Sequence, residues 1–183
     1  MILGISGRIG SGKTTFSNEL KSQLETKGYK VEERNFADKL KKICYELTGY
    51  YGYTQEEKNI FLPIWQKNVG EILQQLGTEV MRDHFDKNVW VKATISNLKD
   101  DTHYIIGDVR FLNEVDAIKK MGGIVIRLEG DPAQVRINSQ RNPNHSSETS
   151  LDSYLDFDEV FINSKTLTEL KQFATIIINK YFK

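Results

Sequence analysis

Residues 1–14 of the chain read MILGISGRIGSGKT. The first six form an apolar run typical of a buried strand, and residues 7–14 follow with the spacing G-x-x-x-x-G-K-T. Glycines at these positions let successive backbone N–H groups point at a polyphosphate. Apolar residues at four-residue steps from Phe16 to Leu24 then predict a helix whose positive end faces the same phosphates. This context favours a phosphate-binding loop (P-loop) over a chance match in an ordinary glycine-rich turn.

Side chains of the loop have distinct expected roles. Lys13 should reach the β- and γ-phosphates of a nucleotide and act in catalysis, and the Thr14 hydroxyl should bind Mg²⁺. The residues expected to bind the nucleotide phosphates are Gly10, Ser11, Gly12, Lys13, Thr14 and Thr15.

Composition limits the class of protein. The chain has 183 residues, long enough for one domain with a sizeable core, and its 25 basic and 25 acidic residues leave no net charge. Neither nucleic acid nor an anionic membrane is therefore an expected partner. Cys44 is the only cysteine, which excludes an internal disulfide and indicates a helix packing residue in a reducing compartment. With a strand at residue 2 and no apolar run of about 20 residues, we expect a cytoplasmic protein without a signal peptide.

Strands and helices alternate along the chain. We expect strands at 2–6, 29–36, 104–107, 124–128 and 159–162, with helices at 39–47, about 65–80, 88–98, 111–121, 130–141 and 167–181. Such alternation predicts an α/β fold of the P-loop NTPase type, a three-layer sandwich with a central parallel sheet and helices on both faces. Residues 1–183 should form a single domain with an acceptor-binding helical region at about 37–100 and a mobile lid at about 130–150. Trp65 and Trp90 are expected to be core anchors.

Two regions near strand ends carry candidate polar side chains, since ligands of such sheets bind beyond the carboxyl ends of the strands. Asp108 is the candidate for a catalytic, magnesium-side carboxylate, with capping of the following helix as the alternative. Asp38, Lys39 and Lys42 follow the second strand, where an acceptor phosphate must lie to receive a phosphoryl group in line. Asp38 is also placed to cap its helix, and the lysines could equally form a solvated helix face.

Two further groups complete the candidate site. Four- and three-residue steps place Gln75, Glu79 and Arg82 on one helix face, where they could bind a base edge and a phosphate or be plain surface polarity. Arg136 and Arg141 precede a polar loop and could close over the transferring phosphate as a lid. An ordinary solvated helix face is the alternative for these two arginines.

Several sequence blocks together resemble the phage-type deoxynucleoside monophosphate kinases. The blocks are residues 7–14, Phe36-Ala-Asp-Lys-Leu-Lys41, residues 73–82 with Trp90, Asp108-Val-Arg-Phe-Leu-Asn-Glu114, Gly122-Gly123 and His145-Ser-Ser-Glu-Thr-Ser-Leu151. The resemblance implies ATP-dependent phosphoryl transfer, with Mg²⁺, to a deoxynucleoside 5′-monophosphate, giving the diphosphate and ADP, and it implies a homodimer. By match to these blocks, Lys13 would bind ATP phosphates, Asp38, Arg82 and Arg110 would lie at the acceptor site, and Arg136 and Arg141 would belong to the lid.

Other nucleotide-binding classes fit the sequence less well. A GTPase would need an Asn-Lys-x-Asp motif, which residues 163–166 do not provide. A nucleic-acid-dependent ATPase is disfavoured because the neutral chain has no long basic stripe. Dephospho-coenzyme A kinase and phosphomevalonate kinase share the architecture and remain alternatives, since they differ only in the acceptor.

Overall fold

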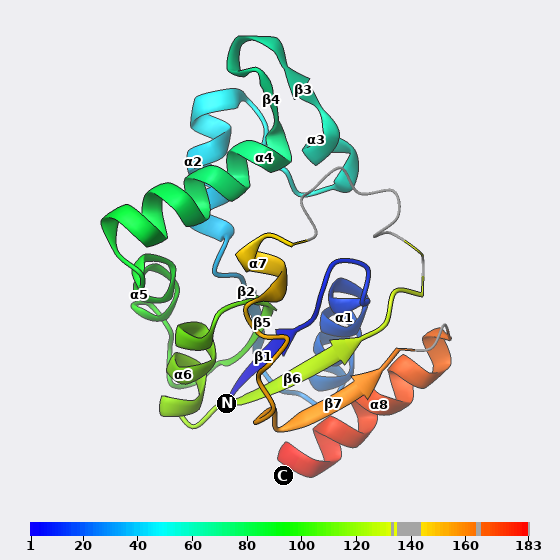
Figure 1. Ribbon diagram of the computed structural model, residues 1–183. Coiled ribbons are helices and arrows are strands. Elements are labelled where there is room, and N and C mark those ends of the chain that lie inside the picture. The colour runs from blue at the N-terminus through cyan, green and yellow to red at the C-terminus, as the bar shows by residue number, and fades with distance from the viewer. Residues whose placement is uncertain (133, 135–143, 164–165, 183) are drawn as a thin grey trace.

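The computed structural model describes the whole chain except residues 133, 135–143, 164–165 and 183. Its centre is a five-stranded parallel sheet in the order β2-β5-β1-β6-β7 (Figure 1). The strands are β1 (Ile2–Ser6), β2 (Val31–Arg34), β5 (His103–Val109), β6 (Ile124–Glu129) and β7 (Glu159–Ile162). The predicted α/β class with a parallel sheet is confirmed.

Helices cover both faces of the sheet. Figure 1 shows α1 (Lys13–Thr26) and α8 (Leu167–Tyr181) on one side, and α5 (Val89–Ile95) and α6 (Leu112–Lys120) on the other. Alternate side chains of each strand divide between the two layers, as the period of an extended strand requires. In β1, Leu3 and Ile5 join the core under α1 and α8, whereas Ile2 joins the core under α5 and α6.

The connection between β2 and β5 is largely helical. It begins with α2 (Asp38–Thr48) and α3 (Gln55–Asn59). A hairpin of β3 (Phe61–Leu62) and β4 (Lys67–Asn68) follows, and its strands are joined by the 3₁₀ turn η1 (Pro63–Trp65). The connection ends with α4 (Val69–Gln74), the π-helix η2 (Gln75–Phe85) and α5. Cys44 packs with Val69 and Ile72 in a small separate core, as expected of a helix packing residue. The part of this connection from α2 to α4 lies beyond the carboxyl ends of the strands (Figure 1).

The two tryptophans differ in burial. Trp90 is 5% exposed and is a core residue as predicted, but Trp65 is 43% exposed, so its prediction as a core anchor is wrong. Trp65 lies in the 3₁₀ turn η1, which connects β3 with β4, and not in the predicted α-helix. The helix begins only at Val69, because Asn68 and Glu71 form a capping box that fixes its start.

The segment after β6 differs from the predicted helix where the structure describes it. Residues 130–132 and 134 form a turn, closed by a hydrogen bond from Gln134 N to Asp131 O. The predicted lid arginines, Arg136 and Arg141, lie outside the described residues. A short helix, α7 (Ser146–Thr149), occupies the predicted polar loop. Among the described helices, none has the length and hydrophobicity needed to cross a lipid bilayer.

Candidate functional site: two adjoining cavities at the strand ends

The P-loop has the backbone that the sequence predicts. Gly10 and Gly12 have φ angles of 81° and 90°, in the left-handed region that favours glycine. At Gly12 a Cβ atom would also lie 2.5 Å from Nδ2 of Asn163, which donates to the Ser11 carbonyl at 3.0 Å. The end of β7 therefore braces the loop, and α1 begins directly at Lys13 with its N-terminal end towards the loop.

Lys13 lies close against the loop backbone. Its ammonium donates to the carbonyls of Gly7 and Arg8 at 2.7 and 2.8 Å. Burial, together with repulsion from the Arg110 guanidinium, lowers the pKa of Lys13 to about 7. An anion bound at the loop would therefore stabilise the charged form of this amine.

The larger cavity, about 770 Å³, extends from the P-loop towards β2, α3 and the start of α8. Lys13, Thr14 and Thr15 line it together with Gly10 and Gly12. Ser11 is fully buried beneath the loop, and its hydroxyl has no hydrogen-bond partner among the described residues. All the expected nucleotide-binding residues except Ser11 thus line one cavity.

Asp108, near the end of β5, is hydrogen-bonded to the backbone just before α2. Its two carboxylate oxygens accept hydrogen bonds from the backbone N–H groups of Phe36 and Ala37, at 2.8 and 2.9 Å. Burial raises the pKa of Asp108, and these two bonds oppose the rise. Asp38 does not cap its helix as predicted: its carboxylate accepts instead from the backbone N–H of Asn35, at 2.9 Å, because Asp108 already holds the turn before α2.

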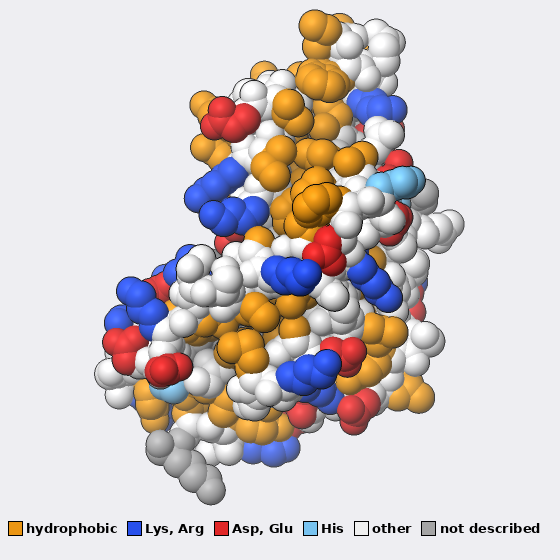
Figure 2. All heavy atoms as spheres, turned by 90° about the vertical axis from the view of Figure 1, so that its left-hand side faces the viewer, with side chains coloured by type: hydrophobic (Ala, Val, Ile, Leu, Met, Phe, Trp, Pro, Cys, Tyr) orange, Lys and Arg blue, Asp and Glu red, His pale blue; other side chains and the backbone are white. Residues whose placement is uncertain are grey.

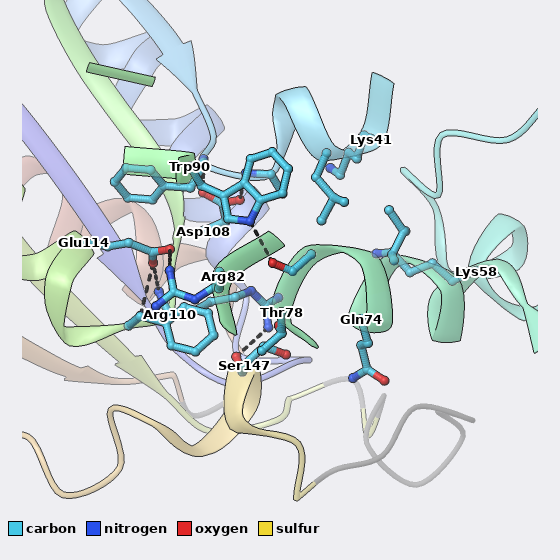
Figure 3. A pocket seen from close by; sticks show the side chains of 16 residues that line it. Lys41, Lys58, Gln74, Thr78, Arg82, Trp90, Asp108, Arg110, Glu114 and Ser147 are labelled. Carbon is cyan, nitrogen blue, oxygen red and sulfur yellow. Dashed lines mark hydrogen bonds and ion pairs between the residues drawn. The ribbon is translucent and has the colours of Figure 1, made fainter. Parts of the chain in front are cut away.

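The smaller cavity, about 150 Å³, lies beside the first, between α2, η2 and the end of β5 (Figure 3). Arg82 is 6% exposed in its wall. Its guanidinium stacks on the Phe111 ring at 3.6 Å, donates to Asn113 at 2.9 Å and lies 3.7 Å from Glu114. Arg82 is therefore a buried, oriented cation in the cavity wall, and its Nη1, which faces Glu114, makes no hydrogen bond with the described residues.

Glu114 supports the same wall from behind. One carboxylate oxygen accepts from the backbone N–H groups of Arg110 and Phe111, at 2.7 and 3.1 Å, and the other faces Arg82. Burial, with the neighbouring Asp108 charge, raises the pKa of Glu114 to about 7. Glu114 therefore holds both the turn after β5, through the two backbone hydrogen bonds, and the Arg82 guanidinium, through its charge.

The helix face towards this cavity is not the predicted one. Gln74, Thr78 and Arg82 are buried and line it, whereas Gln75 and Glu79 are exposed and do not. The prediction assumed an α-helical period, but residues 75–85 form a π-helix, whose wider i→i+5 turns change which side chains face inward. Trp90 closes the cavity by donating from its indole Nε1 to the Gly77 carbonyl, at 2.8 Å.

Among the described residues, four line both cavities: Lys41, Lys58, Asp108 and Arg110. Lys39 and Lys42 are exposed, so the cavities take Lys41 from this group. Lys41 also lies over the Tyr53 ring, at 4.4 Å. The sequence analysis did not select Lys58, Gln74 or Thr78 as site residues. No motif marks Lys58, and Gln74 and Thr78 lie within the block of residues 73–82, where the α-helical period pointed to the neighbouring Gln75 and Glu79.

Comparisons with known proteins identify the family. The model of the deoxynucleotide monophosphate kinase family matches residues 54–173. A protein of Acanthamoeba polyphaga mimivirus, provisionally named a deoxynucleotide monophosphate kinase, is 34% identical over 92% of this chain and 91% of its own length. The enterobacteria phage T4 deoxynucleotide monophosphate kinase is 33% identical over 57% of this chain, and over 43% of that longer protein.

Solved structures show the same fold at low sequence identity. Shikimate kinase from Aquifex aeolicus has a TM-score of 0.52 at 13% identity, with both chains covered completely. Shikimate kinase from Bacteroides thetaiotaomicron has a TM-score of 0.53 at 13% identity, covering 98% of this chain and 97% of its own. These likenesses establish the P-loop kinase architecture, and the sequence matches are more specific. The chain belongs to the deoxynucleotide monophosphate kinase family.

Proposed function

We propose that the protein transfers the γ-phosphoryl group of ATP to the phosphate of a deoxynucleoside 5′-monophosphate, giving the diphosphate and ADP. One observation carries the acceptor assignment. Gln74 and Arg82 both line the smaller cavity, and one buried donor atom in each, Gln74 Nε2 and Arg82 Nη1, has no hydrogen-bond partner in the described part of the chain. A guanidinium suits a phosphate, and an amide suits the edge of a base.

The spacing of these two groups fits a nucleotide. Gln74 and Arg82 are eight residues apart along the continuous α4–η2 helix, an axial rise on the order of 10 Å. A monophosphate held at Arg82 would thus place its base towards Gln74. Phe36, Leu40 and Trp90 provide apolar walls along the cavity, against which the rings can pack (Figure 3).

The larger cavity is the proposed site of ATP. Backbone N–H groups of the P-loop and the start of α1 would hold its phosphates, and the Lys13 ammonium would stabilise charge on the transferring group. Arg110, Lys41 and Lys58 line both cavities and bring positive charge between two anionic substrates. The acceptor phosphate is already an anion, so it needs positioning and no protein base.

Magnesium is the proposed cofactor, and the oxygen donors near the loop suit it. Thr14 offers an exposed hydroxyl and Asp108 a carboxylate, both hard oxygen ligands. Within the described ranges, no three His, Cys, Asp or Glu side chains gather as a protein-only metal site. This fits an ion held largely by substrate phosphates, where it would neutralise charge on the phosphoryl group.

Two further proposals rest on the sequence resemblance. Arg136 and Arg141 are proposed as lid arginines that close over the transferring phosphate, and the protein is proposed to be a homodimer. Large exposed hydrophobic side chains on α2 and the β3–β4 region, which include Ile43, Leu47, Phe61 and Ile64, agree with a buried surface between copies. Figure 2 shows hydrophobic side chains gathered over this upper part of the molecule. Sedimentation velocity at several concentrations tests the dimer.

A substrate panel tests the reaction. Purified protein with Mg-ATP is offered ribo- and deoxynucleoside monophosphates, dephospho-coenzyme A and phosphomevalonate, and both ADP and the phosphorylated product are quantified. We expect a deoxynucleoside diphosphate to form in amounts equal to ADP. Transfer to dephospho-coenzyme A or phosphomevalonate alone would reject the proposed acceptor while keeping the P-loop chemistry.

A further inference from the structure

One buried carboxylate connects the P-loop with the residue that lies between the two cavities. Glu148, on α7, is 7% exposed. Its Oε2 accepts a hydrogen bond from the backbone N–H of Ile9 in the P-loop, at 3.0 Å. Its Oε1 forms an ion pair with the Arg110 guanidinium. A single side chain thus holds two parts of the site that are about a hundred residues apart in sequence.

Arg110 is held from the same side by a second contact. Its Nη1 also donates to the Ser147 carbonyl, at 2.9 Å, so the short helix α7 holds the guanidinium by backbone and side chain together. Figure 3 shows Arg110 beside Ser147. Although burial opposes it, the Glu148 carboxylate raises the pKa of Arg110. Because Arg110 lines both cavities, its position affects both phosphates at once.

The second α7-side carboxylate has a different surrounding. Asp152 pairs with Arg8 and with Arg127, the latter at 3.0 Å. Neither arginine lines either of the two cavities. Asp152 therefore holds the outer side of the P-loop, whereas the contacts of Glu148 lead directly into the site.

We propose that Glu148 is a positioning residue for phosphoryl transfer. It fixes the Arg110 guanidinium against the P-loop backbone, so that the cation between donor and acceptor phosphates keeps one position. Phosphoryl transfer depends on in-line alignment, and a displacement of about 1 Å can reduce a rate by about a hundredfold. This inference rests on the proposed function, since it assigns Arg110 to the region between two phosphates.

Steady-state kinetics of Glu148→Gln test the proposal. The substitution keeps the side-chain volume and an oxygen for the Ile9 N–H, but removes the charge that holds Arg110. We expect kcat to fall between about tenfold and a hundredfold, with the KM for ATP changed less than about twofold. Asp156→Asn is the matched control, because Asp156 is an exposed carboxylate that pairs with Lys119 away from both cavities. This control should keep wild-type kinetics.

A double-mutant cycle separates positioning from general support of the fold. In an Arg110→Ala background, adding Glu148→Gln should change kcat less than about twofold, because the residue through which Glu148 acts is gone. The double variant should also unfold at a higher temperature than Arg110→Ala, which leaves the buried Glu148 charge unpaired. The comparison of the double variant with Arg110→Ala can still be made if Glu148→Gln alone folds poorly.

Two outcomes would overturn the inference. One is wild-type kcat in folded Glu148→Gln, and the other is an equal loss of kcat in both backgrounds. A wild-type protein without deoxynucleoside monophosphate kinase activity would instead reject the proposed function, so the two failures are distinguishable.

Discussion

The proposed donor and acceptor cavities would hold phosphate with different kinds of atoms. Around the P-loop, the main donors are backbone N–H groups and one amine, and their positions follow from three glycines and the start of a helix. In the acceptor cavity, the donors are the side chains of Gln74 and Arg82, held by contacts from Phe111, Asn113 and Glu114. Side-chain replacements should therefore damage the two cavities differently.

A loop built from backbone donors should tolerate most side-chain changes but depend strongly on Lys13, the charged side chain of the loop that lines the cavity. An acceptor site built from side chains distributes its recognition over several residues, and each contributes to substrate choice. The acceptor cavity also carries a buried Arg82–Glu114 pair, in which removal of either partner leaves a buried charge. Variants in the two cavities should separate these properties, in ATP use, acceptor use and stability.

The largest expected effect belongs to Lys13→Ala. The change removes the only cation among the P-loop side chains that line the larger cavity in the described structure, so kcat should fall by about a thousandfold or more. The fold should remain, because removing a buried amine with a pKa of about 7 takes away no strong ion pair. Kinase assays and thermal unfolding measure the two properties, with exposed Lys27→Ala as control. Near-normal kcat in Lys13→Ala would contradict the assignment of the donor cavity.

The sequence predicted the donor side well for a physical reason. Residues 7–14 form one continuous stretch whose backbone angles are set locally by glycine, so spacing alone specifies the geometry. The parallel sheet was also predictable, because its buried strands are short apolar runs separated by helical periods. Partners from distant segments, such as Asn163 against Ser11, require the folded chain, and spacing within the motif does not reveal them.

The next largest effect is expected from Arg82→Lys. A lysine keeps a positive charge for Glu114 but loses the planar guanidinium that stacks on Phe111 and bonds Asn113. We expect kcat/KM for the deoxynucleoside monophosphate to fall by about a hundredfold, the range of a lost charge-assisted hydrogen bond. The KM for ATP should change less than about twofold. A larger change in ATP KM than in acceptor KM would place Arg82 with the donor instead.

The acceptor side was predicted only in part. Arg82 was named from its block, yet Gln75 and Glu79 were placed with it by an α-helical period that the π-helix η2 does not follow. Close tertiary contacts accompany the π-helix over residues 75–85. At Gly77 an added Cβ would lie 2.5 Å from the Leu40 side chain, and the Gly77 carbonyl accepts a hydrogen bond from the Trp90 indole. Such contacts join residues far apart in sequence, so a local pattern cannot specify them.

Gln74→Leu compared with Gln75→Leu tests that register directly. The two positions are adjacent, but only Gln74 lines the acceptor cavity and Gln75 is exposed. Loss of one amide contact to a base should change the ratio of kcat/KM values between bases by about tenfold in Gln74→Leu. Gln75→Leu should leave the ratios unchanged. The opposite pattern would support the α-helical register and reject this face of the helix.

The smallest expected effect concerns protons at the donor cavity. The pKa of Lys13 is lowered to about 7 in the free protein, below its ordinary value, so above pH 7 the folded protein has lost this proton while the unfolded chain keeps it. Its contribution to stability therefore rises with pH between about 7 and 10. Bound phosphate favours the charged amine and raises its pKa, so Mg-ATP binding should take up a proton in the same window.

Calorimetry of Mg-ATP binding in buffers of different ionisation enthalpy measures this uptake. We expect roughly one proton per ATP at pH 8.5 and little at pH 6, with affinity falling about fivefold between pH 7 and 8. Lys13→Arg is the matched control, because an arginine stays protonated throughout and should show neither effect. Uptake that persists in Lys13→Arg would assign the proton to another group, such as Glu114, whose pKa is raised to about 7 in the acceptor cavity. That result would mean that ATP binding reaches across both cavities, and the contrast between them would have to be replaced by one coupled site.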